Sequence, residues 1–547
     1  MIQLLPLFGF VLVVLRAATL CFQSLVIGGI VFEIAVAPRS GTGREPVVQP
    51  VRRLIVGAAI ALALTQAISA ALNASLLMHS VDLTLREVVG ANFVMNAGIG
   101  MGACLIIVAL SAKTDGWGRR AAMLTLAALL IGTSVMTSHA ASSLTHRFPL
   151  VLLTALHQGA AATWIGGLPY LWIALKSASD SDTARRMSQN FSRLAIASVS
   201  ILAAGGVGLG VAYVGSWPAL YGTTYGAMAA AKVLLFGFLL GLGSMNFRIV
   251  RRLRNGDHKS LFNLRRVLEA EIGFGVIAIL TAASLTSQPP AVDLVAGRVS
   301  SSEIIARLTP RSPRFRMPDV RDLGYFVKQR TASSAPSPGA NAGVQLAIRP
   351  TAAFNSLADR EWSEYTHHWA GLVVLLLGLM ALAAQTGQAP WARNWPLLFL
   401  GLAAFLLLRA DPENWPLGPQ SFWASFGDPE VLQHRLAVLL IIAFAIFEWT
   451  VRTGRTTSDG AALVFPAVCA AGGAVLLTHS HALINIKEEL LAELNHLPLA
   501  ILGVVAGWSR WLEIRLPAQD RVRPVLSWVW PICFILVGAL LLDYREI

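Results

Sequence analysis

The sequence predicts an all-α polytopic membrane protein with about 14 transmembrane helices. Of its 547 residues, 55% are hydrophobic and only 13% are charged, whereas a soluble protein of this length exposes far more charge. Apolar runs of about 18 or more residues recur along the chain, each long enough to cross a bilayer as a helix. Basic residues concentrate in alternate loops, as expected for a chain that crosses a membrane repeatedly.

The predicted spans follow one another along the whole chain. They lie near residues 4–36, 54–77, 92–111, 121–139, 149–175, 194–213, 226–248, 268–288, 367–385, 395–409, 434–450, 460–478, 497–512 and 525–542. The first is interrupted by Arg16 and has no short polar region after it, so we interpret it as a retained helix rather than a cleaved signal peptide.

A long polar region divides the spans into two groups. Eight spans occupy residues 1–290, and six occupy residues 364–547. Between them, residues 291–363 form a predicted external loop, in which TASSAPSPGANAG at 331–343 is typical of a flexible linker. The beginning of this loop, residues 292–308, is expected to form a short strand and an amphipathic helix.

The formal net charge of +13 reflects membrane topology rather than nucleic-acid binding. Seven loops on one side, 37–53, 112–120, 176–193, 248–271, 385–394, 448–459 and 508–523, hold 25 Lys and Arg residues. The short loops opposite, 78–91, 139–148, 213–225, 410–433 and 479–496, hold three. This asymmetry predicts that both termini lie outside the cytoplasm. We therefore expect contact with membrane lipids and none with nucleic acid.

Histidines gather on the predicted outer face. Of the 11 in the chain, only His258 falls in a cytoplasmic loop. Imidazole offers a titratable proton and a nitrogen ligand for copper, zinc or haem iron, and a nearby thioether favours Cu(I). In the first group of spans, the candidate ligands are His79, His139 and His157, with Met78, Met95 and Met136.

His157 is the deepest of these candidates. It lies about eight residues inside the fifth span, roughly 12 Å below the outer surface. An ionisable residue at that depth is a functional candidate by default, although a hydrogen-bonded structural histidine is the alternative. Trp164 follows seven residues later and shares its helical face.

The second group of spans carries a further set of histidines at one membrane level, where four helices can bring them together. The candidate ligands are His367, His368, His434, His479, His481 and His496. If residues 484–497 form a surface helix, Glu489, Glu493 and His496 share one face of it, and Glu364 precedes His368 by one turn. Such carboxylates orient ligating imidazoles. The alternative is a solvated amphipathic helix without metal.

Several motifs resemble the CopD copper resistance family. They are SHA at 138–140, HQGAAATWIGG at 157–167, YGTTYGAMAAAK at 221–232 and EAEIGFG at 269–275, in a segment of roughly 139–290. The resemblance implies a bacterial inner-membrane protein that moves copper between periplasm and cytoplasm or supplies it to copper proteins. The family's motif positions correspond to His139, His157, Trp164, Gly166, Gly167, Tyr225, Gly226, Lys232, Asn246 and Glu271.

The leading hypothesis is therefore a copper transporter and not an enzyme. Cu(I) or Cu(II) would enter from the periplasm, with a periplasmic copper-binding protein as a conceivable partner. Lys232 and Glu271 are conceivable groups for coupling to an ion gradient, although Glu271 is expected to cap the cytoplasmic end of its helix. One rival is a haem b electron-transfer protein, with histidines as axial ligands. Another is a scaffold or sensor that uses the external loop.

Overall fold

The computed structural model describes residues 5–39, 44–80, 84–144, 146–254, 260–295, 297–327, 357–423, 429–478 and 486–546. Within these residues the protein is helical and contains no strand. Fourteen helical segments among them are long and apolar enough to cross a membrane. The prediction of an all-α polytopic membrane protein is confirmed.

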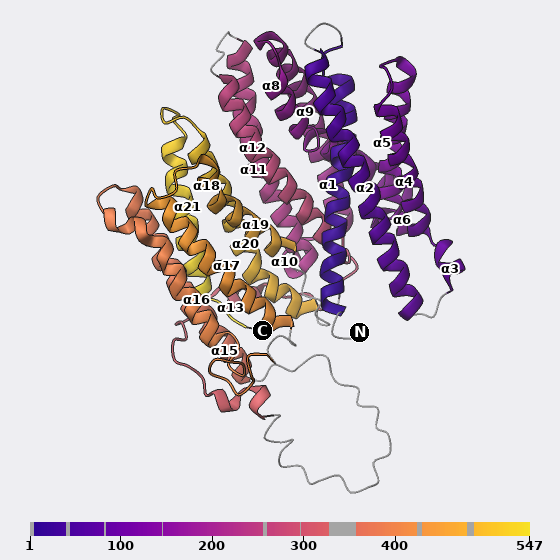
Figure 1. Cartoon of the computed structure of the whole chain (residues 1–547). Coiled ribbons are helices and arrows are strands. Elements are labelled where there is room, and N and C mark those ends of the chain that lie inside the picture. The colour runs from indigo at the N-terminus through magenta and orange to yellow at the C-terminus, as the bar shows by residue number, and fades with distance from the viewer. Residues whose placement is uncertain are drawn as a thin grey trace. The chain divides into compact units, whose positions relative to one another are not determined.

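The helices of the first part of the chain alternate between long spans and short connecting helices (Figure 1). They are α1 (Leu5–Ala35), α2 (Arg44–Ser80), α3 (Leu85–Val89), α4 (Asn92–Ser111), α5 (Trp117–Met136), α6 (His139–Ser142), α7 (Arg147–Trp164), α8 (Leu168–Ser177), α9 (Ser181–Tyr213), α10 (Trp217–Gly222), α11 (Thr224–Arg254) and α12 (Ser260–Leu285). The span at Arg147–Ser177 consists of α7 and α8 together.

The later part of the chain begins with short helices and continues with six more spans. Its helices are α13 (Ser301–Leu308), η2 (Val320–Asp322), α15 (Leu357–Gln385), η3 (Pro390–Leu397), α16 (Leu398–Arg409), α17 (Pro429–Arg452), α18 (Asp459–Ala462), α19 (Val464–Thr478), α20 (Ile486–Arg515) and α21 (Arg523–Leu542). The expected helix near 301–308 is present, whereas the short strand expected before it is not. Residues 291–295 and 297–300 instead form turns and irregular backbone, with the Val299 N–H donating to the Gly222 carbonyl at 3.1 Å.

The chain divides into two compact units. Unit 1 comprises Met1–Ser301, Ala474–Glu493 and Arg515–Asp520, and unit 2 comprises Ser302–Gly473, Leu494–Ile514 and Arg521–Ile547. Helix α20 contributes residues to both units. It runs without interruption through Pro498, so the described residues 486–497 are helical, as the hypothesis for 484–497 required, and they continue into the thirteenth span. The division into 1–290, 291–363 and 364–547 stays a prediction.

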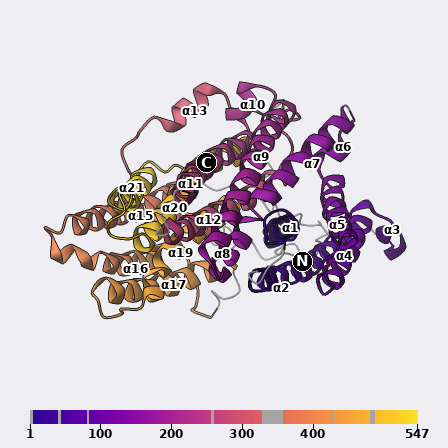
Figure 2. The ribbon, with the colours of Figure 1, turned by 90° about the horizontal axis from the view of Figure 1, so that it is seen from above.

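Helix α1 is the central helix of unit 1. It packs against α2, α5, α7, α8 and α12, and Figure 2 shows it nearly end-on among them. A helix that is apolar all round must be buried or face lipid, and the few polar groups of α1 need partners. Accordingly, Arg16 Nε donates to Thr286 Oγ1 at 2.8 Å and Gln23 Nε2 donates to the Leu130 carbonyl at 3.4 Å. These bonds join α1 to α12 and α5.

Ion pairs tie together the basic ends of the first helices. Glu33 at the end of α1 accepts from Arg119 at 2.9 Å, and Arg44 lies 2.6 Å from Asp115. Asp115, in the loop between α4 and α5, also accepts from Arg120. The hydrogen bond from Arg120 lowers the pKa of Asp115 to about 2. The loop that connects these spans therefore carries a permanent negative charge among its arginines.

Unit 2 has an aromatic core. Its buried members include Trp395 in η3, Phe465 in α19 and Trp530 in α21. The Trp395 and Trp530 ring centroids lie 5.7 Å apart, and Phe465 lies 5.2 Å from Trp395 and 5.4 Å from Trp530. Large rings that meet edge to face bury much apolar area at low entropic cost. This cluster joins three helices that are remote in sequence.

Candidate functional site

His157 lies on α7 where that helix packs against a glycine-rich part of α9. Its Nδ1 lies 3.1 Å from the Leu202 carbonyl oxygen. A Cβ atom added at Gly205 would lie 3.3 Å from both Cβ and Nδ1 of His157, tighter than ordinary van der Waals contact. Small residues allow close helix packing in membranes, and here the glycines of α9 provide the space that the imidazole ring occupies.

This contact determines which ring nitrogen of His157 can bind a ligand. Because a carbonyl oxygen only accepts hydrogen bonds, Nδ1 carries the proton and Nε2 carries the lone pair. Metal-ligating histidines usually donate their other ring N–H to a carbonyl or carboxylate in this way. No described residue is bonded to Nε2. The geometry therefore presents a neutral imidazole that can ligate copper, zinc or haem iron through Nε2.

His139 is the first residue of α6. It contacts α9 at a different height from His157. Its ring packs against Tyr213 at the end of α9, with centroids 6.4 Å apart. Its Nε2 atom is buried and has no hydrogen-bond partner. Tyr213 lies eleven residues after Leu202 on α9, which corresponds to about 16 Å along the helix axis. The structure thus places His139 and His157 at two stations along α9 rather than in one site.

The methionine candidates are dispersed. Met95 on α4 and Met136 at the end of α5 are 49% and 40% exposed, and Met78 on α2 is half-buried. The side chain of His79 lies outside the described residues. No described contact brings these three methionines together. Their role as copper ligands stays a prediction.

A buried carboxylate accepts a hydrogen bond from the Trp164 indole. Trp164 Nε1 donates to Glu271 Oε1 at 3.0 Å, and Asn246 Nδ2 donates to Glu271 Oε2. Glu271 is 2% exposed, Trp164 is 2% exposed and Asn246 is 8% exposed. The cluster joins the end of α7 to α11 and α12.

The expectation that Glu271 caps its helix is wrong. Glu271 is the twelfth residue of α12, about 16 Å from the helix start, and both its carboxylate oxygens accept from other helices. Hydropathy places a residue within a span but does not show which neighbouring helix supplies its partners. Asn246 and Trp164, which are 25 and 107 residues away in sequence, supply them here.

Gly166 shows why the motif after His157 requires glycine. It connects α7 to α8, and a Cβ atom there would lie 1.9 Å from the Ser24 carbonyl oxygen of α1. On α1, a Cβ atom at Gly28 would lie 2.3 Å from the Gly166 carbonyl carbon. Any side chain at either position would separate the two backbones. The glycines therefore place Trp164 against the central helix of unit 1.

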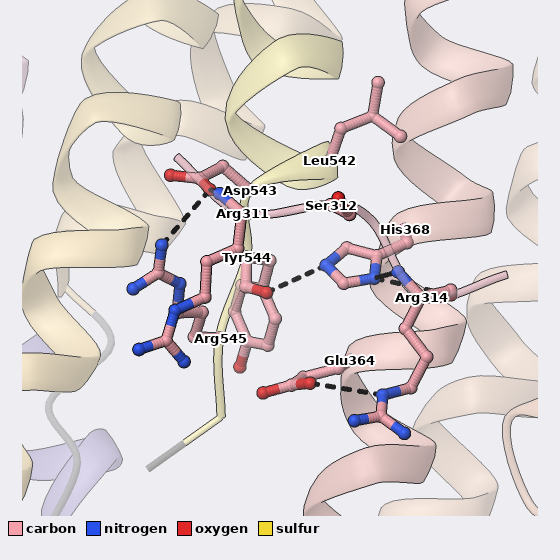
Figure 3. Close-up of a pocket in the computed structure, with 9 residues that line it drawn as sticks. All are labelled: Arg311, Ser312, Arg314, Glu364, His368, Leu542, Asp543, Tyr544 and Arg545. Carbon is pink, nitrogen blue, oxygen red and sulfur yellow. Dashed lines mark hydrogen bonds and ion pairs between the residues drawn. The ribbon is translucent and has the colours of Figure 1, made fainter. Parts of the chain in front are cut away.

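In unit 2, His368 is held by backbone groups on both sides of its ring. Nδ1 accepts from the Arg314 N–H at 2.7 Å, and Nε2 lies 2.9 Å from the Tyr544 carbonyl oxygen. Figure 3 shows the ring lying between these two segments, beside a cavity of about 320 Å³. Because both nitrogens are engaged, His368 offers no lone pair to a metal in this arrangement.

His367 stacks on the C-terminal segment. Its ring centroid lies 3.8 Å from that of Tyr544, with planes 15° apart, and its Nδ1 lies 2.8 Å from the Ser363 carbonyl oxygen. Glu546 accepts from the Tyr544 hydroxyl at 2.9 Å and also from the Ser363 hydroxyl. The carbonyl acceptor leaves the Nε2 lone pair of His367 as its ligand-capable atom.

His434 at the start of the eleventh span pairs with Asp411. The distance from His434 Nδ1 to Asp411 Oδ1 is 2.7 Å, and the aspartate side chain is only 7% exposed. A buried carboxylate on one ring nitrogen orients the other toward a ligand. Asp411 was not among the predicted residues, because it is 23 positions from His434 and is brought near it only when α16 and α17 pack together.

The remaining predicted residues of the second group are placed as follows. Glu364 on α15 lies 3.6 Å from Arg314 Nε, Glu493 on α20 is 5% exposed, and His496 on α20 is half-buried. His479, His481 and the side chain of Glu489 lie outside the described residues. Among the residues that are described, no three or more His, Cys, Asp or Glu side chains are arranged to hold one metal ion. The four-helix metal site stays a prediction.

Comparison with known proteins identifies the region that contains this helix cluster. Residues 185–285 match the family model described as "Copper resistance protein D". A segment of 142 residues is 30% identical to the "Copper transport protein CutJ" of Bacillus subtilis (strain 168), covering 25% of each chain. The chain thus spans about a quarter of the length of this curated relative. No solved structure matches it.

The matched segment contains both Asn246 and Glu271. It also contains the part of α9 that contacts His157. It includes Leu202 and Gly205 on α9, Asn246 on α11 and Glu271 on α12. His157 and Trp164 lie before it, and the structure brings them against it. Through this segment, the chain is similar to the copper resistance protein D (CopD) family.

Proposed function

We propose that this protein transports copper across the inner membrane of a bacterium, with His157 as the ligand inside the unit 1 helix bundle. The observation that carries the proposal is the hydrogen bond from His157 Nδ1 to Leu202, which leaves Nε2 as a ligand in a membrane span. The match of the adjoining segment to the CopD family model supports copper as the cargo. Direction from periplasm to cytoplasm agrees with the histidine-rich external face.

A route along α9 accounts for both histidine stations. Copper would bind first near His139, whose buried Nε2 lacks a partner, and then reach His157 about 16 Å further along the helix. Methionines Met78, Met95 and Met136 would capture Cu(I) at the surface, because thioethers favour this ion. A periplasmic copper-binding protein would deliver it, and the histidines of unit 2 would form a separate external station.

The topology that this route requires follows the charge asymmetry of the loops. Both termini would be periplasmic, since the seven loops on one side hold 25 Lys and Arg residues. His139, at the start of α6, would then face the periplasm, and the end of α11 and the start of α12 would face the cytoplasm. A protease added to the outside of intact spheroplasts should therefore cleave the long loop at 291–363.

The haem b alternative is less favoured by the surroundings of His157. A membrane haem requires two axial ligands on facing helices. The helix that faces His157 presents Leu202, Gly205 and Gly206, and none of these can ligate iron through its side chain. Elemental analysis of the purified protein separates the two hypotheses, since near-stoichiometric iron would indicate haem.

The deciding experiment combines metal content with uptake. Wild-type protein should retain copper after incubation and washing, and cells that express it should accumulate copper faster than cells without it. His157→Ala should lose at least most of the uptake while inserting normally. His258→Ala, which removes the one histidine of the predicted cytoplasmic loops, is the matched control and should behave as wild type. Undiminished uptake by His157→Ala would remove this residue from the route.

A further inference from the structure

Glu271 differs from the other buried acids of this protein in its partners. Its two carboxylate oxygens accept from the Trp164 indole and the Asn246 amide, both of which are neutral donors. Four other acids with little exposed side chain lie against arginine. These pairs are Glu33–Arg119 at 2.9 Å, Glu269–Arg515 at 2.6 Å, Glu448–Arg452 at 2.6 Å and Glu513–Arg510 at 2.7 Å.

The charged groups on the helices that pack against α12 have other partners or lie away from Glu271. Arg16 of α1 donates to Thr286, and Glu33 of α1 pairs with Arg119. On α8, Lys176 lies 5.5 Å from the Trp172 ring centroid. On α11, Arg248, Arg251 and Arg252 are exposed, and Lys232 lies fourteen residues before Asn246, about 21 Å along the helix. Within the described residues, the partners of Glu271 are therefore the neutral Trp164 and Asn246 side chains, and no ion pair is formed.

An ionised carboxylate without a cation is costly inside a membrane domain, even when two N–H groups stabilise it. The site can lower this cost by binding a positive charge. Paired acids such as Glu269 have no such need, because an arginine already supplies the charge. The partners of Glu271 thus indicate a site whose charge is variable rather than permanently neutralised.

Asn246 provides a group suited to a protonated carboxyl. Its Nδ2 donates to Glu271, while its Oδ1 is buried and has no hydrogen-bond partner. An amide carries a donor and an acceptor on the same carbon. Rotation of this amide would replace the donor by the acceptor opposite Glu271 Oε2. The same side chain can therefore stabilise either form of the carboxyl group, and the unpartnered oxygen gains a donor only in the protonated form.

We propose that Glu271, Asn246 and Trp164 form a proton-binding site in unit 1. The carboxylate takes up one proton on Oε2, the new O–H donates to Asn246 Oδ1, and Oε1 becomes a carbonyl oxygen that still accepts from the Trp164 indole. Release of the proton reverses the amide rotation. This inference rests on the proposed function in one respect, since the proton would be the ion exchanged when copper moves.

Infrared difference spectroscopy of the purified full-length protein tests the site without requiring transport. Spectra recorded at acidic and alkaline pH should differ by a carbonyl band of a protonated carboxylic acid, which shifts in D2O. Glu271→Gln should remove that band. Glu269→Gln, on the same helix but at an arginine-paired acid, is the matched control and should leave it unchanged.

A second variant protects the test against misfolding of Glu271→Gln. Trp164→Phe keeps the carboxyl group and removes the donor to its carbonyl oxygen, so the band should remain and move to higher frequency. The proposal is overturned if no protonated band appears, if it survives Glu271→Gln, or if sodium instead of acid changes the spectrum. If copper transport in proteoliposomes leaves the proton flux unchanged, only the coupling is rejected. If copper transport is absent while the carboxylic acid band is intact, only the proposed function is rejected.

Discussion

Units 1 and 2 both bury a glutamate against the N–H group of a tryptophan, but they surround it differently. In unit 1, Trp164 Nε1 donates to Glu271 at 3.0 Å. In unit 2, Trp530 Nε1 donates to Glu513 at 2.9 Å, and Arg510 lies 2.7 Å from the same carboxylate. The same hydrogen bond therefore supports an acid without a cation in one unit and an ion pair in the other.

The arginines of unit 2 are themselves enclosed by aromatic rings. The guanidinium carbon of Arg452 lies 5.2, 5.5 and 5.1 Å from the ring centroids of Trp395, Phe465 and Trp530. Ring faces attract cations, and Glu448 supplies the countercharge at 2.6 Å. These groups neutralise one another in place, which is what a structural charge requires. Unit 1 instead leaves one acid to be neutralised by an ion that can leave.

The largest expected effect tests whether the unit 2 pair is structural. Glu448→Gln leaves Arg452 buried without its countercharge, and breaking a buried pair costs about 3–5 kcal/mol of the free energy of unfolding. Thermal unfolding in detergent, followed by tryptophan fluorescence, should show the loss. Glu448→Gln combined with Arg452→Met should recover much of it. A single variant as stable as wild type would show that the rings alone hold Arg452.

A second prediction concerns Asp411, a buried acid of unit 2 that pairs with a histidine instead of an arginine. Asp411→Asn should weaken copper binding at His434 by roughly 10–100-fold, the usual effect of removing a carboxylate behind a metal ligand. Copper titration of the purified protein would measure it, with His434→Ala as the reference for full loss. Unchanged affinity in both variants would mean that this pair serves only the fold and that unit 2 has no copper station there.

The third prediction compares the two tryptophans directly. Trp164→Phe and Trp530→Phe each remove one hydrogen bond to a buried carboxylate, worth about 1.5–3 kcal/mol when the acceptor is charged. Both should lower the unfolding temperature to a similar extent. Only Trp164→Phe should also reduce copper uptake, because its partner has no arginine to maintain the carboxylate. Equal losses of copper uptake in the two variants would show that Glu271 and Glu513 do not differ in their role.

His157 could be predicted as a functional candidate because the hydropathy of the sequence shows it inside an apolar span. An ionisable residue inside an apolar span is visible in the sequence, and its depth alone makes it a functional candidate. The prediction of a ligand cluster in the second group of spans depended on convergence of helices. The structure instead shows His368 bonded to backbone on both nitrogens and His367 stacked on Tyr544, contacts that no spacing pattern contains.

By itself, the sequence determined the helical class, the number of spans and the asymmetry of charge between the loops. These properties arise from the free energy of moving each segment between water and lipid, which depends on local composition. Only the tertiary structure decided that Glu271 meets Asn246 and Trp164 rather than capping α12. Pairing of buried polar groups depends on which helices become neighbours, and that is settled by packing across residues remote in the chain.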